Sequence, residues 1–226
     1  MERISLNSIT LTTFEKNPDS IQAEKLISTC NNIQTAFNIY KTLIHHQSPT
    51  LGIFKSLITA CLDLKQPGRA KDIWKEMEKY SIIPDYWCFC LLLRICAKIG
   101  DSILAKKLFL KVKNKEFKFS INVIHCAQII QSLSYNGNMN DSMEVLEWMD
   151  EHGIKPDAQL YVCLLISCTD LVIGKQIHSH IIKTQIKWNL HLENSLLNMY
   201  SKCGNMNDAR SIFDNIQSKN VISWNS

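Results

Sequence analysis

The stretch NSLLNMYSKCGNMNDARSIFDNIQSKN, residues 194–220, decides the fold, and VISWNS, residues 221–226, follows it directly. From Leu190 onward, apolar residues recur at helical spacing in two short segments that the turn Cys203-Gly204-Asn205 separates. Residues 221–226 then begin the first of these two patterns again. A pattern that restarts is a repeat, so its period organises the rest of the chain.

The same period runs back towards the N-terminus. Pro49, Pro84 and Pro156 stand 35 and then 72 residues apart, which is one unit and then two units with a small insertion. We number the places so that Asp85 and Asp157 each close a unit. The repeat units are then 17–50, 51–85, 86–122, 123–157, 158–189, 190–220 and a partial unit, 221–226, which together make a repeat array over 17–226. Residues 1–16 are expected to be a poorly ordered leader.

Apolar and small residues recur at fixed places in these units. Apolar pairs fall at places 7 and 8, and a small residue falls at place 20: Leu57-Ile58, Leu92-Leu93, Ile129-Ile130, Leu164-Leu165 and Leu196-Leu197, then Ala70, Ala105, Ser142, Gly174 and Ala209. Each unit therefore predicts two facing amphipathic helices, and no segment alternates as a strand does. The expected fold class is all-α, a right-handed superhelical solenoid of antiparallel helix pairs.

The bulk composition narrows the classes of function. The chain has 226 residues, 46% of them hydrophobic and 20% charged, with a formal net charge of +4. That charge permits contact with nucleic acid without indicating it, because Lys and Arg form no dense runs. The longest apolar runs are too short to span a membrane. The N-terminus has neither a secretory signal core nor an Arg-rich, acid-poor transit composition.

The spacing of the cysteines and histidines indicates neither a disulfide framework nor a metal site. The nine cysteines contain no C-x-x-C and are odd in number, so we expect core thiols in a reducing compartment, as at Cys61, Cys96 and Cys168. His178 and His180 are two residues apart and would face different sides of a helix. We expect no catalytic site, no metal site and no cofactor within these residues.

Several segments resemble the pentatricopeptide repeat family, in the variety of long and short units (PLS) abundant in land plants. The segments are GKQIHSHIIK, NSLLNMYSKCGNMNDARSIFDNI and NVISWNS, with WKEMEKYSIIPD and WMDEHGIKPD earlier. The resemblance implies a superhelix that binds single-stranded RNA in mitochondria or chloroplasts, where members mature, stabilise or edit transcripts alongside protein partners. Many relatives carry a deaminase-like domain after the repeats. Here such a domain would lie beyond Ser226, and the interrupted last unit indicates a C-terminally incomplete chain.

The resemblance also implies roles for residues at places 2, 5 and the last place of a unit. The implied base-reading residues are Asn194, Asn220, Asn225, Asp85, Asp157 and Asn189, and the implied base-wedging residues are His191 and Ile222. The pair Asn194–Asn220 implies a pyrimidine, cytidine more than uridine. Lys55, Lys98 and Lys202 are suited by charge to phosphate, with a solvated surface role as the alternative. For Asn194 the alternative is an ordinary polar residue in a first helical turn.

A second hypothesis is a protein-binding helical scaffold without RNA readout. It is favoured by Ala127 and Val162, which occupy place 5 in two units and have no polar atom to read a base edge. The 35-residue period and the segment 194–210 favour RNA binding.

Overall fold

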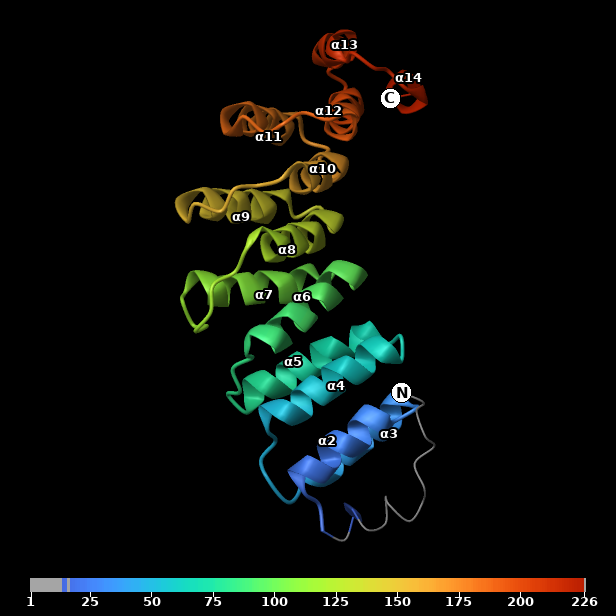
Figure 1. Cartoon of the computed structure of the whole chain (residues 1–226), viewed down its shortest axis with the longest axis vertical. Helices are drawn as coiled ribbons and strands as arrows, with labels where there is room; N and C mark the ends of the chain where they lie inside the picture. The colour runs from blue at the N-terminus through green and yellow to red at the C-terminus, as the bar shows by residue number, and fades with distance from the viewer. Residues whose placement is uncertain (1–13, 16, 226) are drawn as a thin grey trace. The chain divides into compact units, whose positions relative to one another are not determined.

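The structure is a computed structural model, and it describes residues 14, 15 and 17–225. Every regular element in that part of the chain is helical, as the all-α prediction requires, and none of these helices is long and apolar enough to cross a membrane. In chain order they are α2 (Ser20–Thr29), α3 (Ile33–Ile44), α4 (Leu51–Asp63), the short 3-10 helix η1 (Pro67–Arg69), α5 (Ala70–Lys79), α6 (Tyr86–Ile99), α7 (Ser102–Lys113), α8 (Val123–Tyr135), α9 (Met139–Glu151), α10 (Ala158–Ser167), α11 (Leu171–Thr184), α12 (Leu190–Lys202), α13 (Met206–Asn215) and α14 (Val221–Asn225) (Figure 1). Residues 1–13 and 16 of the expected leader lie outside the described residues, whereas Phe14 is described and buried.

The chain divides into two compact parts, which we describe separately. The first includes α2 to α6 and takes in Lys115–Phe119, and the second comprises Gly100–Asn114 and everything from Ser120 onward. In the first part α4 packs against α2, α3, α5 and α6. In the second part α8, α10 and α12 contact one another in order, and each also contacts its own following helix, α9, α11 or α13. Helix pairs are therefore the repeated structural element inside each part.

The predicted core positions are buried. The apolar pairs at places 7 and 8 are at most 4% exposed in every unit from 51–85 onward. All nine cysteines are free, and Cys61, Cys96 and Cys168 are fully buried, as predicted. Burial raises the pKa of the Cys61 thiol to about 12, because the thiolate would lose its hydration.

Small residues at place 20 allow the helices to approach closely. A Cβ atom added to Gly174 of α11 would lie 2.3 Å from the Met199 sulfur of α12, so only glycine fits that contact as it stands.

In the turn after α12, Gly204 has a φ of +73°, a conformation that glycine adopts without strain. The predicted turn at residues 203–205 thus ends one helix and allows the next to begin.

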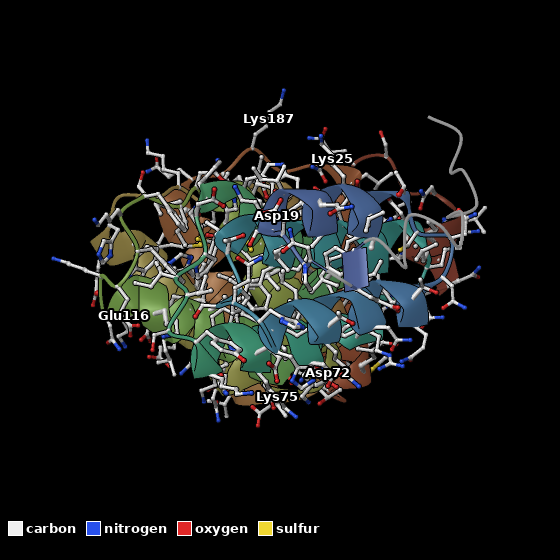
Figure 2. The ribbon with its side chains drawn as sticks, turned by 90° about the horizontal axis from the view of Figure 1, so that it is seen from below. Asp19, Lys25, Asp72, Lys75, Glu116 and Lys187 are labelled. Atoms are coloured by element: carbon white, nitrogen blue, oxygen red, sulfur yellow. The ribbon has the colours of Figure 1, made fainter. Side chains whose placement is uncertain are left out.

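The outer face of a second helix is polar, as its period predicts. In α5 the side chains of Ile73, Trp74 and Met77 are buried, whereas Asp72 and Lys75 are exposed. Figure 2 shows Asp72 and Lys75 projecting away from the ribbon. The apolar stripe therefore packs this helix against its neighbours, and the Tyr40 hydroxyl of α3 also donates to Glu76 of α5 (2.8 Å).

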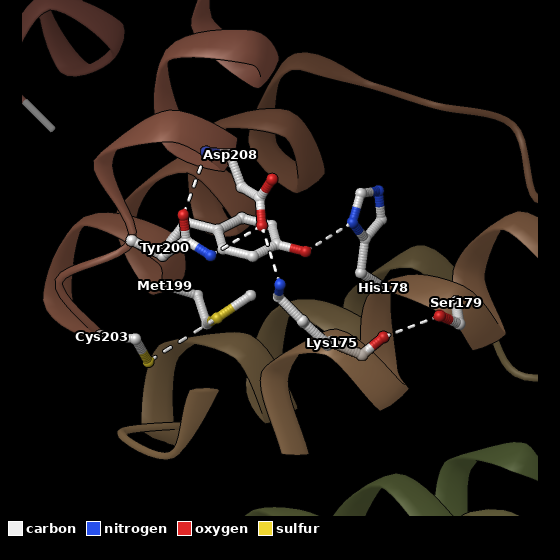
Figure 3. A network of polar contacts seen from close by, with 8 residues as sticks. Lys175, His178, Ser179, Met199, Tyr200, Cys203 and Asp208 are labelled. Atoms are coloured by element: carbon white, nitrogen blue, oxygen red, sulfur yellow. Dashed lines mark hydrogen bonds and ion pairs between the residues drawn. The ribbon is translucent and has the colours of Figure 1, made fainter. Parts of the chain in front are cut away.

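His178 and His180 have separate polar partners. His178 Nδ1 lies 2.8 Å from the Tyr200 hydroxyl of α12, as the close-up in Figure 3 shows. His180 Nε2 lies 2.6 Å from a carboxylate oxygen of Asp150, and its Nδ1 lies 2.7 Å from the Tyr161 hydroxyl. The two rings thus tie α11 to different neighbouring helices. Among the described residues, no group of three or more His, Cys, Asp or Glu is placed to hold a metal ion.

Acidification is expected to destabilise the second part through His178. Burial lowers the pKa of its imidazole, and the Asp208 carboxylate offsets this only in part. As pH falls below the ordinary value of about 6.5, the unfolded chain binds a proton that folded His178 resists, so the free energy of unfolding falls. Burial also lowers the pKa of His125, so His125 adds to the fall in the free energy of unfolding at low pH. Thermal melting at pH 7.5 and 5.5 should show this loss, and it should be smaller in His178→Phe, which removes one titrating ring; an equal loss in both chains would contradict it.

Candidate nucleic-acid interface

The last residue of each repeat unit caps the first helix of the next unit. Asp85 accepts a hydrogen bond from the Cys88 backbone N–H (3.0 Å), Asp157 from Leu160 (2.8 Å) and Asn189 from Leu192 (2.9 Å). Asn122 and Asn220 cap α8 and α14 in the same way. Asp and Asn are preferred N-caps because their short side chains satisfy free N–H groups of the first turn. Capping alone therefore explains an Asp or Asn at these places, a role that the sequence analysis missed although the residue type signals it.

At the junction after unit 190–220, the place 5 and last-place side chains meet. Asn194 of α12 is 5% exposed, and its Nδ2 donates to Oδ1 of Asn220 over 3.3 Å. Asn220, in contrast, is exposed to solvent. The structure thus brings together the two residues to which the resemblance gives base reading, with Asn220 as the accessible member of the pair.

The corresponding pair in unit 51–85 is an ion pair. The Lys55 ammonium bonds the Asp85 carboxylate, and it also lies 5.6 Å from the centre of the Trp87 ring. Burial acts to raise the pKa of Asp85, but the Lys55 ammonium and the Cys88 N–H hold it below its ordinary value. Lys55 is therefore committed to a protein partner, which reduces its capacity for phosphate.

Two other units have no such pair. Val162, at place 5 of unit 158–189, is 2% exposed, so it belongs to the core. Ala127 of unit 123–157 is half-buried and has no polar side-chain atom. At those junctions Asp157 and Asn189 are exposed and act as caps, with no polar partner at place 5.

Place 2, where a wedge is expected, is exposed in every unit from 86–122 onward. His191 is exposed and Ile222 is 59% exposed. The same place holds Trp87 and Ile124, at 47% and 63% exposure, which the sequence analysis did not single out. Large apolar side chains left in water at one repeated place can pack against base faces. Both could have been identified from the repeat register, since each is the second residue of its unit.

The remaining candidates are also on the surface. Lys98 and Lys202 are exposed in the last turns of α6 and α12. Asn225 is exposed at the end of α14. Charge on the first helices is thus available to solvent without an ion pair at Lys98 or Lys202 among the described residues.

These features define a class of protein, a helix-pair repeat protein. In it, the last residue of each unit is the N-cap of the first helix of the next unit. The chain carries pentatricopeptide repeats. The sequence model described as PPR repeat matches residues 53–82 and 194–221, and the model described as pentatricopeptide repeat-containing protein matches residues 88–170.

Known relatives and solved structures agree with this class. A mitochondrial pentatricopeptide repeat-containing protein of Arabidopsis thaliana is 29% identical over 76% of this chain and 27% of its own length. A second pentatricopeptide repeat-containing protein of the same plant, whose name gives no organelle, is 31% identical over 81% of this chain and 26% of its own length. A chloroplastic one is 22% identical over 89% and 44%. The structure of PPR10 with an 18-nucleotide psaJ RNA element has a TM-score of 0.57, with 14% identity over 95% of this chain and 36% of that one. The pentatricopeptide domain of Arabidopsis thaliana protein-only RNase P 1, bound to tRNA, has a TM-score of 0.50, with 13% identity over 84% and 96%.

The structural matches establish the fold, which is that of pentatricopeptide repeat solenoids. The chain spans between 22 and 44% of the length of the curated relatives it matches.

Proposed function

We propose that this chain is a sequence-selective adaptor that binds single-stranded RNA and presents a transcript for processing, including C-to-U editing, in a mitochondrion or chloroplast. The contact between Asn194 and Asn220 carries the proposal, because it places two polar side chains of one unit at the junction where a base edge would be read. The matched structures that contain RNA and the relatives named mitochondrial or chloroplastic support it. We further propose the PLS variety, protein partners of a processing complex, and no catalytic role for these residues.

Base selection by this chain should be narrow. Among the unit junctions that the structure describes, only that of Asn194 with Asn220 pairs an amide at place 5 with an amide at the last place, since Lys55 is ion-paired and Val162 is buried. The other units would contribute shape, exposed apolar side chains at place 2 and positive charge. Specificity should therefore concentrate on one or two nucleotides.

The test is binding of the purified chain to a pool of randomised single-stranded RNA at two salt concentrations, alongside Asn194→Ala. We expect the chain to enrich a short motif with one pyrimidine position, and Asn194→Ala to weaken the preference at that position roughly tenfold. Asn198→Ala, on the same helix α12, is the matched control and should leave the motif unchanged. Salt-sensitive binding without a motif would remove sequence selectivity from the proposal. Absence of binding at low salt would refute RNA binding and favour a protein-binding scaffold.

A further inference from the structure

Ser223 completes a buried network with the two asparagines. It lies on α14, belongs to the partial unit 221–226 and is only 2% exposed. Its hydroxyl lies 2.6 Å from Asn194 Oδ1 and 3.1 Å from Asn220 Oδ1. A hydroxyl of the following unit therefore reaches back to both members of the amide pair.

The directions of these bonds fix both amides. The Ser223 hydroxyl donates to Asn194 Oδ1 and accepts from the Asn220 backbone N–H over 3.2 Å. Asn220 Oδ1 accepts from Asn194 Nδ2 and from the Ser223 backbone N–H. Both side-chain oxygens are thus occupied within the network, and the Asn194 NH₂ group also faces into it, towards Asn220 Oδ1.

What remains for a ligand is a set of donors. Among the described residues, the Nδ2 of exposed Asn220 has no hydrogen-bond partner, and Asn194 Nδ2 has a second hydrogen. The cytosine edge offers two neighbouring acceptors, N3 and O2, whereas uracil has an N3–H donor between its two oxygens. A donor-only amide pair therefore suits cytosine and opposes the uracil N3–H, because two facing donors leave each other unsatisfied.

We infer that Ser223 is a positioning residue that makes the Asn194–Asn220 pair select cytidine over uridine. The inference rests on the proposed function and deepens it. With the hydroxyl in place, turning the Asn194 amide would break two bonds at once: the bond from the Ser223 hydroxyl to Asn194 Oδ1 and the bond from Asn194 Nδ2 to Asn220 Oδ1. Without the hydroxyl, only the bond from Asn194 Nδ2 to Asn220 Oδ1 still holds the Asn194 amide. The amide then turns at a lower cost and can accept from the uridine N3–H, so uridine binds better.

In the units from 51–85 onward, no other third place holds a hydroxyl. Its other occupants are Ile53, Cys88, His125, Leu160 and Leu192. His125 also bonds a cap, through its Nδ1 to the Asn122 backbone N–H (3.2 Å), but place 5 of that preceding unit is Cys90. Only the junction after unit 190–220 combines an amide at place 5, an amide at the last place and a hydroxyl that orients them.

The experiment compares the affinities of two RNAs that differ only by C or U at the pyrimidine position selected from the random pool. For the unchanged chain we expect C to bind roughly tenfold more tightly than U. In Ser223→Ala the ratio should fall to about one, mainly because U binds better, and Ser223→Thr, which keeps the hydroxyl, should restore it. Ser195→Ala is the matched control, since this buried hydroxyl on α12 bonds only its own helix, at the His191 carbonyl (2.8 Å).

The possible results separate this inference from the proposed function. A collapse of the C-to-U ratio in Ser223→Ala alone supports it. A ratio that survives in Ser223→Ala, or affinities for C and U that fall equally, overturns the role of Ser223 while RNA binding stands. If the unchanged chain binds neither RNA, the proposed function fails and the inference fails with it. A helical circular-dichroism spectrum for each variant excludes unfolding as the cause.

Discussion

Replacing Phe89 with alanine is expected to lower the free energy of unfolding by about 3–5 kcal/mol, a large fraction of the stability of a typical domain. Phe89 of α6 is fully buried. Its ring centre lies 5.3 Å from that of Phe117 and 5.1 Å from that of Phe119, and the latter two rings are stacked. Truncation would leave a cavity under both rings and release the segment Lys115–Phe119 from the first compact part.

The measurement is chemical unfolding followed by circular dichroism, with Tyr86→Ala as the matched control. Tyr86 is on the same helix and also contacts Phe119, at 5.5 Å between ring centres, but it is 47% exposed. It should therefore cost less than about 1 kcal/mol, because its ring is already half in water. Equal losses for the two variants would show that the Phe89 cluster does not stabilise the chain.

The Phe89 cluster also shows where sequence reasoning ends. Phe89 stands three residues before the apolar pair Leu92-Leu93, which the register predicted as core, and is buried on the same helix face. The segment KNKEFKFSIN, residues 113–122, closes the unit that contains the small insertion. Its Phe117 is buried and its Phe119 half-buried, and both rings pack on Phe89 of α6, a tertiary contact that no local period encodes.

In the candidate interface, too, some features could be predicted from the sequence and others depend on tertiary contacts. The places 2, 5 and the last place could be assigned from the repeat register, because repeated places occupy equivalent positions in each helix pair. The capping role of Asp157 or Asn189 was readable from residue type and position. The ion pair of Lys55 with Asp85 and the reach of Ser223 to Asn194 were not, since they depend on side-chain directions across a junction. The sequence therefore gives the places of the candidate residues, whereas the hydrogen-bond partners of their side chains come from the structure.

Removing Lys98 and Lys202 together is expected to weaken RNA binding about tenfold at low salt and to flatten its salt dependence. Each phosphate contact to a single strand contributes about 0.7 to the slope of log affinity against log salt concentration. The double variant removes two such contacts, so this slope should become shallower by about 1.4. Between 50 and 200 mM salt, the affinity of Lys98→Gln with Lys202→Gln should then fall about sevenfold less than that of the unchanged chain. Filter binding to a single-stranded RNA over this range measures both quantities.

The rival explanation for these lysines is local, because a cation in the last turn of a helix interacts favourably with the helix dipole. Lys41 and Lys183 supply the control, since each is an exposed lysine in the last turn of a second helix, α3 or α11. Lys41→Gln with Lys183→Gln removes the same charge from the same kind of helix end. If both double variants reduce the salt dependence of binding equally, RNA binding depends on the net charge of the chain. The phosphates then make no specific contact with Lys98 and Lys202 on the first helices. If only Lys98→Gln with Lys202→Gln does so, RNA phosphates contact the last turns of the first helices that carry these two lysines, α6 and α12.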